Sequence, residues 1–233
     1  MAPILSVKDV GVVLDGMSIV EAISFELAAG DNLAIIGPNG SGKTVLLRAL
    51  LGMVPHSGAV AWAPGVKVGY VPQKIEADRN LPLSIDDLLW AKARVVHLPS
   101  ESVRSVADVI GLSPEILDKP IGRLSGGQFQ KALIAFALLG DPNVLLLDEP
   151  TASLDQLTEE RVYELIRRLQ KTFGLTLIIV SHDLSMVYRE ATKVLCLNRQ
   201  GLCFGPPSSV LTPETLQALY GEHLHFYQHP HNP

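Results

Sequence analysis

The sequence predicts an α/β fold with a mainly parallel core sheet, because apolar runs alternate with segments of helical periodicity. Two runs, Val144 to Leu147 and Leu175 to Val180, are apolar throughout, which is typical of strands buried on both faces. Apolar residues between them recur at helical spacing: Val162, Leu165, Ile166 and Leu169. This alternation indicates a layered α/β domain.

The N-terminal half contains a strand, a loop and a helix in that order. Ala34 to Ile36 precedes a glycine-rich turn, after which Leu46, Leu47, Leu50 and Leu51 repeat at helical spacing. The earlier segment, Ile4 to Leu27, reads as short strands, and we expect an antiparallel β subdomain there. The stretch from about Leu83 to Leu139 lacks strong strand signals, so we expect a helical subdomain inserted between core strands.

Near the C-terminus, Lys193 to Leu197 and Leu202 to Phe204 flank Asn198 to Gly201, which predicts a hairpin. A short helix around Glu214 to Tyr220 is expected before a polar tail. We therefore predict a single domain: residues 1–82 and 140–220 form the core with the β subdomain, residues 83–139 the helical subdomain, and residues 221–233 a histidine-rich tail.

Composition places the chain among ordinary globular proteins, with 233 residues, 47% hydrophobic and 18% charged. The longest apolar segment, Ala132 to Leu139, is well short of the roughly 18 residues that span a bilayer. The first residues lack the pattern of a signal peptide. Cys196 and Cys203 fit a reducing compartment better than a disulfide scaffold. We therefore expect a cytoplasmic protein, and the net charge of −5 offers no broad basic field for nucleic acid.

A phosphate-binding loop is the first motif that carries chemistry. Its eight residues lie between the expected strand and helix: Gly37, Pro38, Asn39, Gly40, Ser41, Gly42, Lys43 and Thr44. The glycines let backbone N–H groups converge on phosphate oxygens at the positive end of a helix. Lys43 is expected to reach the β- and γ-phosphates, and the Thr44 hydroxyl to ligate magnesium.

Two carboxylates follow the buried strand that ends at Leu147. Asp148 and Glu149 are placed at the carboxyl end of the sheet, beside the phosphate loop. We expect Asp148 to hold magnesium and Glu149 to act as general base on the attacking water. An Asp-Glu pair after a strand is more often a solvated loop, and only its combination with the phosphate loop makes it specific.

A second anion site is predicted where a serine and two glycines open a helix: Ser125, Gly126, Gly127 and Gln128. One loop already binds the nucleotide of its own chain, so a second site invites a γ-phosphate held by another copy. With Leu124 in front, this string resembles the signature of the ATP-binding cassette family. The resemblance covers nearly the whole chain, and it implies a P-loop ATPase of that type, acting as a homodimer with ATP and Mg²⁺.

Three further roles are implied by the resemblance alone. Gln73 matches a glutamine that contacts magnesium and water and relays motion to a membrane partner. Asp155 matches an aspartate that couples the two sites of the dimer, and His182 a histidine that contacts the γ-phosphate. Taken in isolation, a plain structural role is favoured for all three residues: Asp155 as a capping or turn residue, and His182 as a hydrogen-bonded surface histidine.

One position departs from the family pattern. Members usually stack adenine on an aromatic residue in an early strand, and by spacing that position falls near Leu14. No Phe, Tyr, Trp or His occurs before Phe25. A stacked ring is worth roughly 1–3 kcal/mol by analogy with nucleic-acid binders, so relaxed base selectivity is an open consequence.

Within the family, the strings around Gln73 and Leu83 resemble ATPase subunits of bacterial zinc, manganese and iron importers, with the Val194 to Asn198 hairpin closest to the zinc branch. The resemblance implies two copies of this chain beneath two membrane permease subunits, on the inner face of the cell membrane, with a separate metal-binding protein outside. An ATPase of iron-sulfur assembly or DNA maintenance is the alternative. The DNA-maintenance class carries long coiled-coil or zinc-module insertions between the motifs, and a chain of 233 residues is too short to hold them.

The tail offers one more hypothesis, because it holds four of the seven histidines: His223, His225, His229 and His231. Imidazoles are good zinc ligands, so the tail is a candidate sensor of imported zinc. A solvated tail without any role is the alternative.

Overall fold

A mixed sheet organises the molecule. The computed structural model describes residues 2–73 and 82–221, and within them one sheet has the strand order β4-β1-β2-β9-β8-β3-β7-β6-β5. The strands are β1 (Leu5–Leu14), β2 (Met17–Leu27), β3 (Asn32–Ile36), β4 (Ser57–Trp62), β5 (Val68–Val71), β6 (Val144–Asp148), β7 (Thr176–Val180), β8 (Lys193–Asn198) and β9 (Gln200–Gly205). Neighbours from β8 to β5 pair in parallel, whereas β1 pairs with β2 and β4 in antiparallel fashion. The predicted fold class is confirmed.

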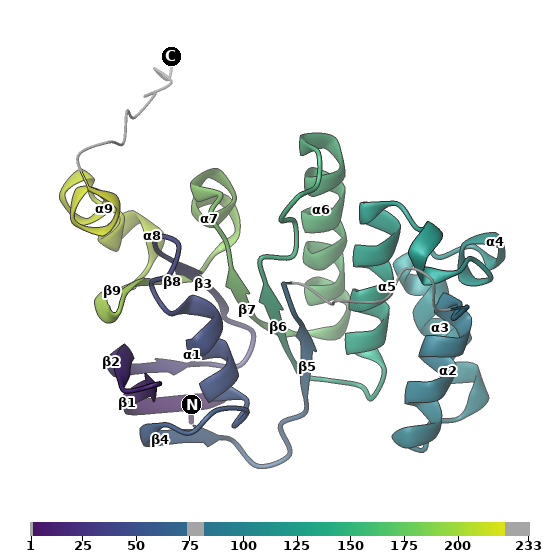
Figure 1. Ribbon diagram of the computed structural model, residues 1–233, viewed down its shortest axis with the longest axis horizontal. Coiled ribbons are helices and arrows are strands. Elements are labelled where there is room, and N and C mark those ends of the chain that lie inside the picture. The colour runs from purple at the N-terminus through teal and green to yellow at the C-terminus, as the bar shows by residue number, and fades with distance from the viewer. Residues whose placement is uncertain (1, 74–81, 222–233) are drawn as a thin grey trace.

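Helices cover both faces and one end of this sheet. They are α1 (Lys43–Leu50), α2 (Ile85–Val95), α3 (Ser100–Ile110), α4 (Pro114–Leu117), η1 (Ile121–Arg123), α5 (Gly126–Leu138), α6 (Gln156–Phe173), α7 (Leu184–Glu190), α8 (Pro207–Val210) and α9 (Pro213–Tyr220). Figure 1 shows α2, α3 and α4 gathered at one end of the molecule and the strands β1, β2 and β4 at the other. In the described part of the chain, no helix is both long and apolar enough to cross a bilayer.

The core lies on both faces of the parallel strands, as their uniform hydrophobicity predicts. On β6, Leu145 and Leu147 pack into one cluster with α5 and α6, whereas Leu146 packs into a second cluster with α1. Because successive side chains alternate, Asp148 shares the face of Leu146 and points toward α1. The alternation of side chains along β6 therefore places the Asp148 carboxylate next to α1, the helix that follows the phosphate loop.

The N-terminal strands are longer than expected, with 10 residues in β1 and 11 in β2. Their pairing shifts register at several points, and Asp9 and Ala22 take positive φ angles of 48° and 50°. Such irregularities interrupt the alternation of apolar and polar residues from which strands are read. The expectation of short strands is therefore wrong. The predicted C-terminal hairpin forms, but its turn is tighter, with Asn198 already paired to Gln200 around Arg199.

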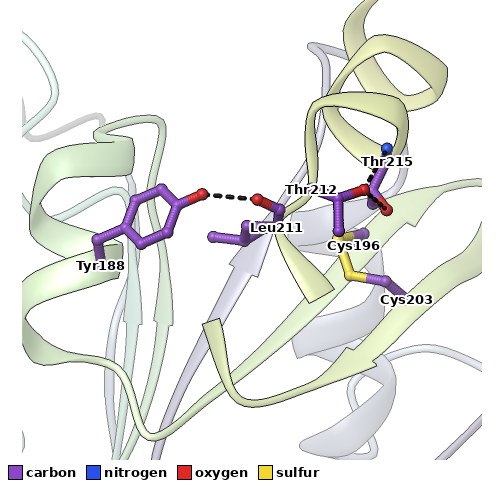
Figure 2. Close-up of a disulfide and its surroundings, with 6 residues drawn as sticks. All are labelled: Tyr188, Cys196, Cys203, Leu211, Thr212 and Thr215. Carbon is purple, nitrogen blue, oxygen red and sulfur yellow. Dashed lines mark hydrogen bonds between the residues drawn. A yellow bond between two sulfur atoms is a disulfide. The ribbon is translucent and has the colours of Figure 1, made fainter. Parts of the chain in front are cut away.

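The two cysteines also differ from expectation. Cys196 of β8 and Cys203 of β9 are direct cross-strand partners, with 4.9 Å between their Cα atoms, and they form a disulfide (Figure 2). Their separation of seven residues did not reveal this pairing, because the register depends on the tight turn at Arg199. The interpretation of unpaired cysteines is wrong, and cysteine usage no longer indicates a reducing compartment. The four tail histidines named above lie outside the described residues.

Candidate functional site

The phosphate loop connects the buried strand β3 to α1, as the sequence predicts. Gly42 caps α1 in a left-handed conformation (φ 98°), which a side chain would disfavour. Gly37 sits so close to the carbonyl oxygen of Leu197 that a Cβ atom would overlap it. The backbone N–H of Arg199 donates to the Ser41 carbonyl at 3.1 Å, so the hairpin of β8 and β9 buttresses the loop. The β8–β9 hairpin therefore supports the loop on one side, and the N-terminus of α1 lines the cavity on the other.

Lys43 is buried at the start of α1 with 5% of its surface exposed. Its Nζ donates to the carbonyl oxygens of Gly37 and Pro38, each at 2.9 Å, so the ammonium lies within the curve of the loop. Burial lowers the pKa of Lys43, and the nearby charges of Glu149 and Asp148 oppose that shift. The cation and the two carboxylates therefore share one electrostatic environment.

Asp148 ends β6 and is almost fully buried, with 1% of its surface exposed. The Thr44 hydroxyl donates to its Oδ1 atom at 3.1 Å, whereas Oδ2 is buried without a hydrogen-bond partner among the described residues. Burial raises the pKa of this carboxyl. A buried orphan carboxylate oxygen beside a hydroxyl is an oxygen donor set of the kind Mg²⁺ prefers, so these two residues fit the ion.

Glu149 takes a left-handed backbone conformation with φ 48°. For a residue other than glycine this conformation costs about 1–3 kcal/mol of folding free energy. Its N–H donates to the Val180 carbonyl at 3.1 Å, which ties it to β7. Both carboxylate oxygens are engaged: His182 Nε2 lies 2.6 Å from Oε1, and Gln73 Nε2 donates to Oε2 at 2.6 Å. Residues from two other loops therefore converge on the Glu149 carboxylate.

A polar cavity of about 470 Å³ unites these groups. Its walls come from β2, the phosphate loop, α1 and the loops after β5, β6 and β7: Ile19, Asn39, Gly40, Gly42, Lys43, Thr44, Val45, Gln73, Glu149 and His182. Leu14 is not among these lining residues; it lies at the β1–β2 turn opposite Met17. Ile19, on the following strand, supplies an apolar wall instead. Sequence reasoning missed Ile19, whose strand pattern gives no signal of a binding role.

The signature residues form a helix start, as predicted, but away from this cavity. The Ser125 hydroxyl accepts from the N–H of Gln128, and the Gln128 side chain accepts from the N–H of Ser125, which makes a reciprocal cap on α5. A Cβ at Gly126 would meet the Leu154 side chain at 2.8 Å. The glycine thus permits close packing of α5 against Leu154.

Asp155 caps α6, by accepting from the N–H of Thr158 at 3.0 Å and from its hydroxyl at 2.7 Å. These bonds, the hydroxyl first, lower the pKa of Asp155. The methyl group of Thr158 in turn lies where a Cβ of Gly127 would sit, so the cap and the start of α5 abut. The capping interpretation of Asp155 is confirmed by this geometry.

The comparison with protein-family models decides the affiliation. Residues 20–152, more than half of the chain, match the family described as ABC transporter. The chain belongs to this family. The match begins with β2 and ends just after Glu149, so it contains the phosphate loop, Gln73, the signature helix start and both carboxylates. ATP binding and hydrolysis are the activity of this family's ATPase domain, as the motifs predict.

Curated relatives share this assignment over most of their length. The zinc import ATP-binding protein ZnuC of Cereibacter sphaeroides is 43% identical over 204 residues, which cover 87% of this chain and 82% of that protein. The protein of the same name from Ruegeria pomeroyi is 39% identical over 220 residues, which cover 94% and 84%.

Solved structures give the same fold. An inward-facing metal-chelate type ABC transporter matches with a TM-score of 0.84 and 30% identity, over 94% of this chain and 89% of that one. The cbiO1 protein of Clostridium perfringens, part of the ABC transporter complex cbiONQ, matches with a TM-score of 0.79 and 26% identity, over 94% of both chains. This ABC ATPase is thus similar to subunits of metal transporters in both sequence and structure.

Proposed function

We propose that this ABC ATPase powers the import of a divalent metal ion, with zinc as the substrate and manganese or iron as the alternatives. The observation that carries the proposal is the convergence of Gln73 and His182 on Glu149 beside the phosphate loop, in a chain similar to proteins named for zinc import. The geometry of the site supports ATP hydrolysis, and the names of the relatives support zinc as the transported ion.

In the proposed mechanism, the N–H groups at the start of α1 and the Lys43 ammonium bind the β- and γ-phosphates of ATP. Thr44 and Asp148 would hold Mg²⁺, with Gln73 as a further ligand. When bound, Mg²⁺ supplies charge neutralisation on the phosphate oxygens. Glu149 takes a proton from the attacking water, and His182 contacts the γ-phosphate. The products are ADP and phosphate.

The second anion site indicates that ATP is held between two copies of the chain. Ser125, Gly126, Gly127 and Gln128 lie outside the cavity that contains Lys43 of the same chain. A twofold dimer brings this helix start to the γ-phosphate on the partner copy, because a symmetric interface uses each surface reciprocally. Asp155 caps the adjoining helix and would couple the two sites across this interface.

We further propose a docking groove for a membrane permease. A largely apolar cavity of about 480 Å³ is lined by Arg48, Met53, Val54, Tyr70, Pro72, Leu133 and Phe136. Met53 is 61% exposed there. Pro72 directly precedes Gln73, which touches Glu149, so a permease segment in this groove would sense the catalytic loop. The chain then acts on the inner face of the cell membrane, and a separate extracytoplasmic protein delivers the metal.

The chain divides along these roles in the proposal. Residues 1–82 and 140–220 bind nucleotide, and residues 1–82 also supply most of the permease groove. Residues 83–139 carry the signature together with Leu133 and Phe136 of the groove, and residues 221–233 form the tail.

Metal uptake tests the proposed function. Cells that lack the native gene and carry either the parent or Glu149→Gln are given radioactive zinc under zinc limitation. We expect accumulation with the parent and none above background with the variant. Equal zinc accumulation would overturn the transport proposal and favour a non-transport ATPase. Parallel manganese and iron uptake identifies the metal.

The docking groove has its own test. Met53→Asp is expected to lower zinc uptake and co-purification with the permease, while the isolated chain keeps its basal ATPase. Val95→Asp places the same charge at another exposed apolar position and serves as the control, because Val95 is 76% exposed on α2. Unimpaired permease binding by Met53→Asp would exclude this groove.

A further inference from the structure

We propose that the Tyr163 hydroxyl is a positioning group for ATP hydrolysis: it joins the loop that carries Glu149 to the loop that carries His182. The inference rests on the proposed roles of these two residues. Glu149 and His182 both lie just beyond the ends of their strands, β6 and β7, so the pairing of those strands does not by itself fix the position of the two side chains relative to each other.

Tyr163 lies on α6, between the two loops. Its phenolic oxygen is 3.1 Å from the hydroxyl of Thr151, two residues after Glu149. It is also 3.2 Å from the hydroxyl of Ser181, which directly precedes His182. The exposed fractions are 8% for Thr151, 6% for Tyr163 and 2% for Ser181. Three buried hydroxyls without solvent must satisfy one another, so this bridge is specific.

The hydrogens along the bridge have one consistent order. The Thr151 hydroxyl lies 2.7 Å from Oε1 of Glu159, and a carboxylate only accepts. Since a hydroxyl carries one hydrogen, Thr151 donates it to Glu159 and accepts the phenolic hydrogen of Tyr163. Ser181 then donates to Tyr163 and accepts from the N–H of Asp183 at 3.1 Å. Every member is satisfied, and the Tyr163 hydroxyl contacts a hydroxyl from each of the two loops.

The catalytic pair needs such a link because its own supports are few. Glu149 has the unfavourable φ of 48°, and such a conformation persists only where neighbouring structure fixes it. The side chain of His182 is 45% exposed, and its polar contact among the described residues is with Glu149. The separation of 2.6 Å between them therefore depends on the two backbone loops, and Tyr163 joins those loops from behind.

The same bridge reaches the turn proposed to face the partner copy. Glu159 follows Asp155 by one helical turn, and its N–H donates to the Asp155 carbonyl at 2.9 Å. A displacement at this turn is thus passed through Thr151 and Tyr163 to Ser181. The bridge connects the proposed dimer contact to both catalytic loops through named hydrogen bonds.

Steady-state ATPase kinetics test the inference with matched variants. Tyr163→Phe and Thr151→Val remove the bridge, whereas Thr151→Ser keeps the hydroxyl. We expect the first two to lower kcat by about tenfold to a hundredfold with KM for ATP unchanged, since small misplacements of catalytic groups cost that much. Thr151→Ser should retain the parent rate. Tyr188→Phe is the control: it removes a 2.7 Å bond to the Leu211 carbonyl outside the site (Figure 2).

A double variant separates positioning from plain destabilisation. If Tyr163 acts through His182, Tyr163→Phe should change kcat little in a His182→Ala background, because the pair it positions is already lost. An equal fold-loss in both backgrounds would overturn the inference. Parent-like kcat for both Tyr163→Phe and Thr151→Val would also overturn it. Glu149→Gln is run alongside, and if that variant keeps the parent rate, the proposed base itself is wrong.

Discussion

The Nε2 atom of His182 lies 2.6 Å from Oε1 of Glu149, and this contact joins the carboxyl ends of two neighbouring parallel strands. Gln73 binds the other carboxylate oxygen, also at 2.6 Å. Gln73 and His182 come from different loops, so the orientation of the Glu149 carboxylate depends on the positions of both loops and of its own. A base held in this way is oriented before water arrives, which reduces the reorganisation that hydrolysis needs.

Removing the imidazole tests its contribution. His182→Ala is expected to lower kcat by about tenfold to a thousandfold, because one oriented polar contact in the transition state is worth that much. ATP affinity should stay near the parent value, since the phosphate loop is untouched. Turnover and fluorescent-nucleotide binding are measured side by side. A parent-like kcat would show that His182 has no catalytic contact.

The buried charge of Asp148 is expected to lower the stability of the fold in the absence of nucleotide. Burial raises its folded pKa above the ordinary value of 3.8, so its charge destabilises the fold above that raised pKa, and the penalty disappears below 3.8. Asp148→Asn keeps an acceptor for Thr44 and removes the charge. At pH 7 without nucleotide, the variant should melt a few degrees higher.

That advantage should shrink as the pH falls through the folded pKa, and Mg²⁺-dependent ATP binding should be lost at every pH. Thermal melts across pH and nucleotide titrations with and without Mg²⁺ check both statements. A lower melting temperature at pH 7 would contradict the inference that the buried Asp148 charge destabilises the nucleotide-free fold.

A ring at the β1–β2 turn is expected to restore base stacking. Leu14→Tyr should tighten adenine nucleotides by on the order of 1 kcal/mol if the turn folds over the base. The parent should bind ATP and GTP about equally, and the variant should favour ATP. Ile19→Ala is the companion change, because Ile19 lines the cavity. If Leu14→Tyr leaves both affinities unchanged and Ile19→Ala weakens them, the base lies against Ile19 alone.

Glu149→Gln keeps the shape of the side chain and removes the base. Hydrolysis should fall by about a hundred- to ten-thousand-fold while ATP binding survives. Single-turnover measurements with radiolabelled ATP separate the two quantities. Turnover near the parent rate would mean that another group accepts the proton.

The sequence predicted much of the fold and the phosphate site because those features are local. The uniform apolar runs identified β6 and β7, and the glycines identified the loop before α1. The position of Asp148 and Glu149 beside the loop was predictable because both lie at the carboxyl end of a buried strand, Asp148 as its last residue. Short-range patterns of this kind need no knowledge of distant contacts.

Features that depend on register were not predicted. The Cys196–Cys203 disulfide requires a tight turn at Arg199, and the length of β1 is hidden by its irregular pairing. Tyr163 lies beside the apolar face of α6, and a buried tyrosine normally needs a partner for its hydroxyl. The partners, Thr151 and Ser181, lie on loops 12 and 18 residues away in the sequence, so only the folded chain shows these contacts.

The shared ATP site is tested most directly by the mass of the Glu149→Gln chain in Mg²⁺ and ATP. Sedimentation equilibrium should show a dimer, because ATP is bound and not consumed. Adding Ser125→Arg, which fills the second anion site, should return the chain to a monomer that still binds ATP. Ser100→Arg, at the exposed first residue of α3, is the matched control and should leave the dimer intact. A double variant of Glu149→Gln and Ser125→Arg that dimerises as well as Glu149→Gln alone would contradict the shared site.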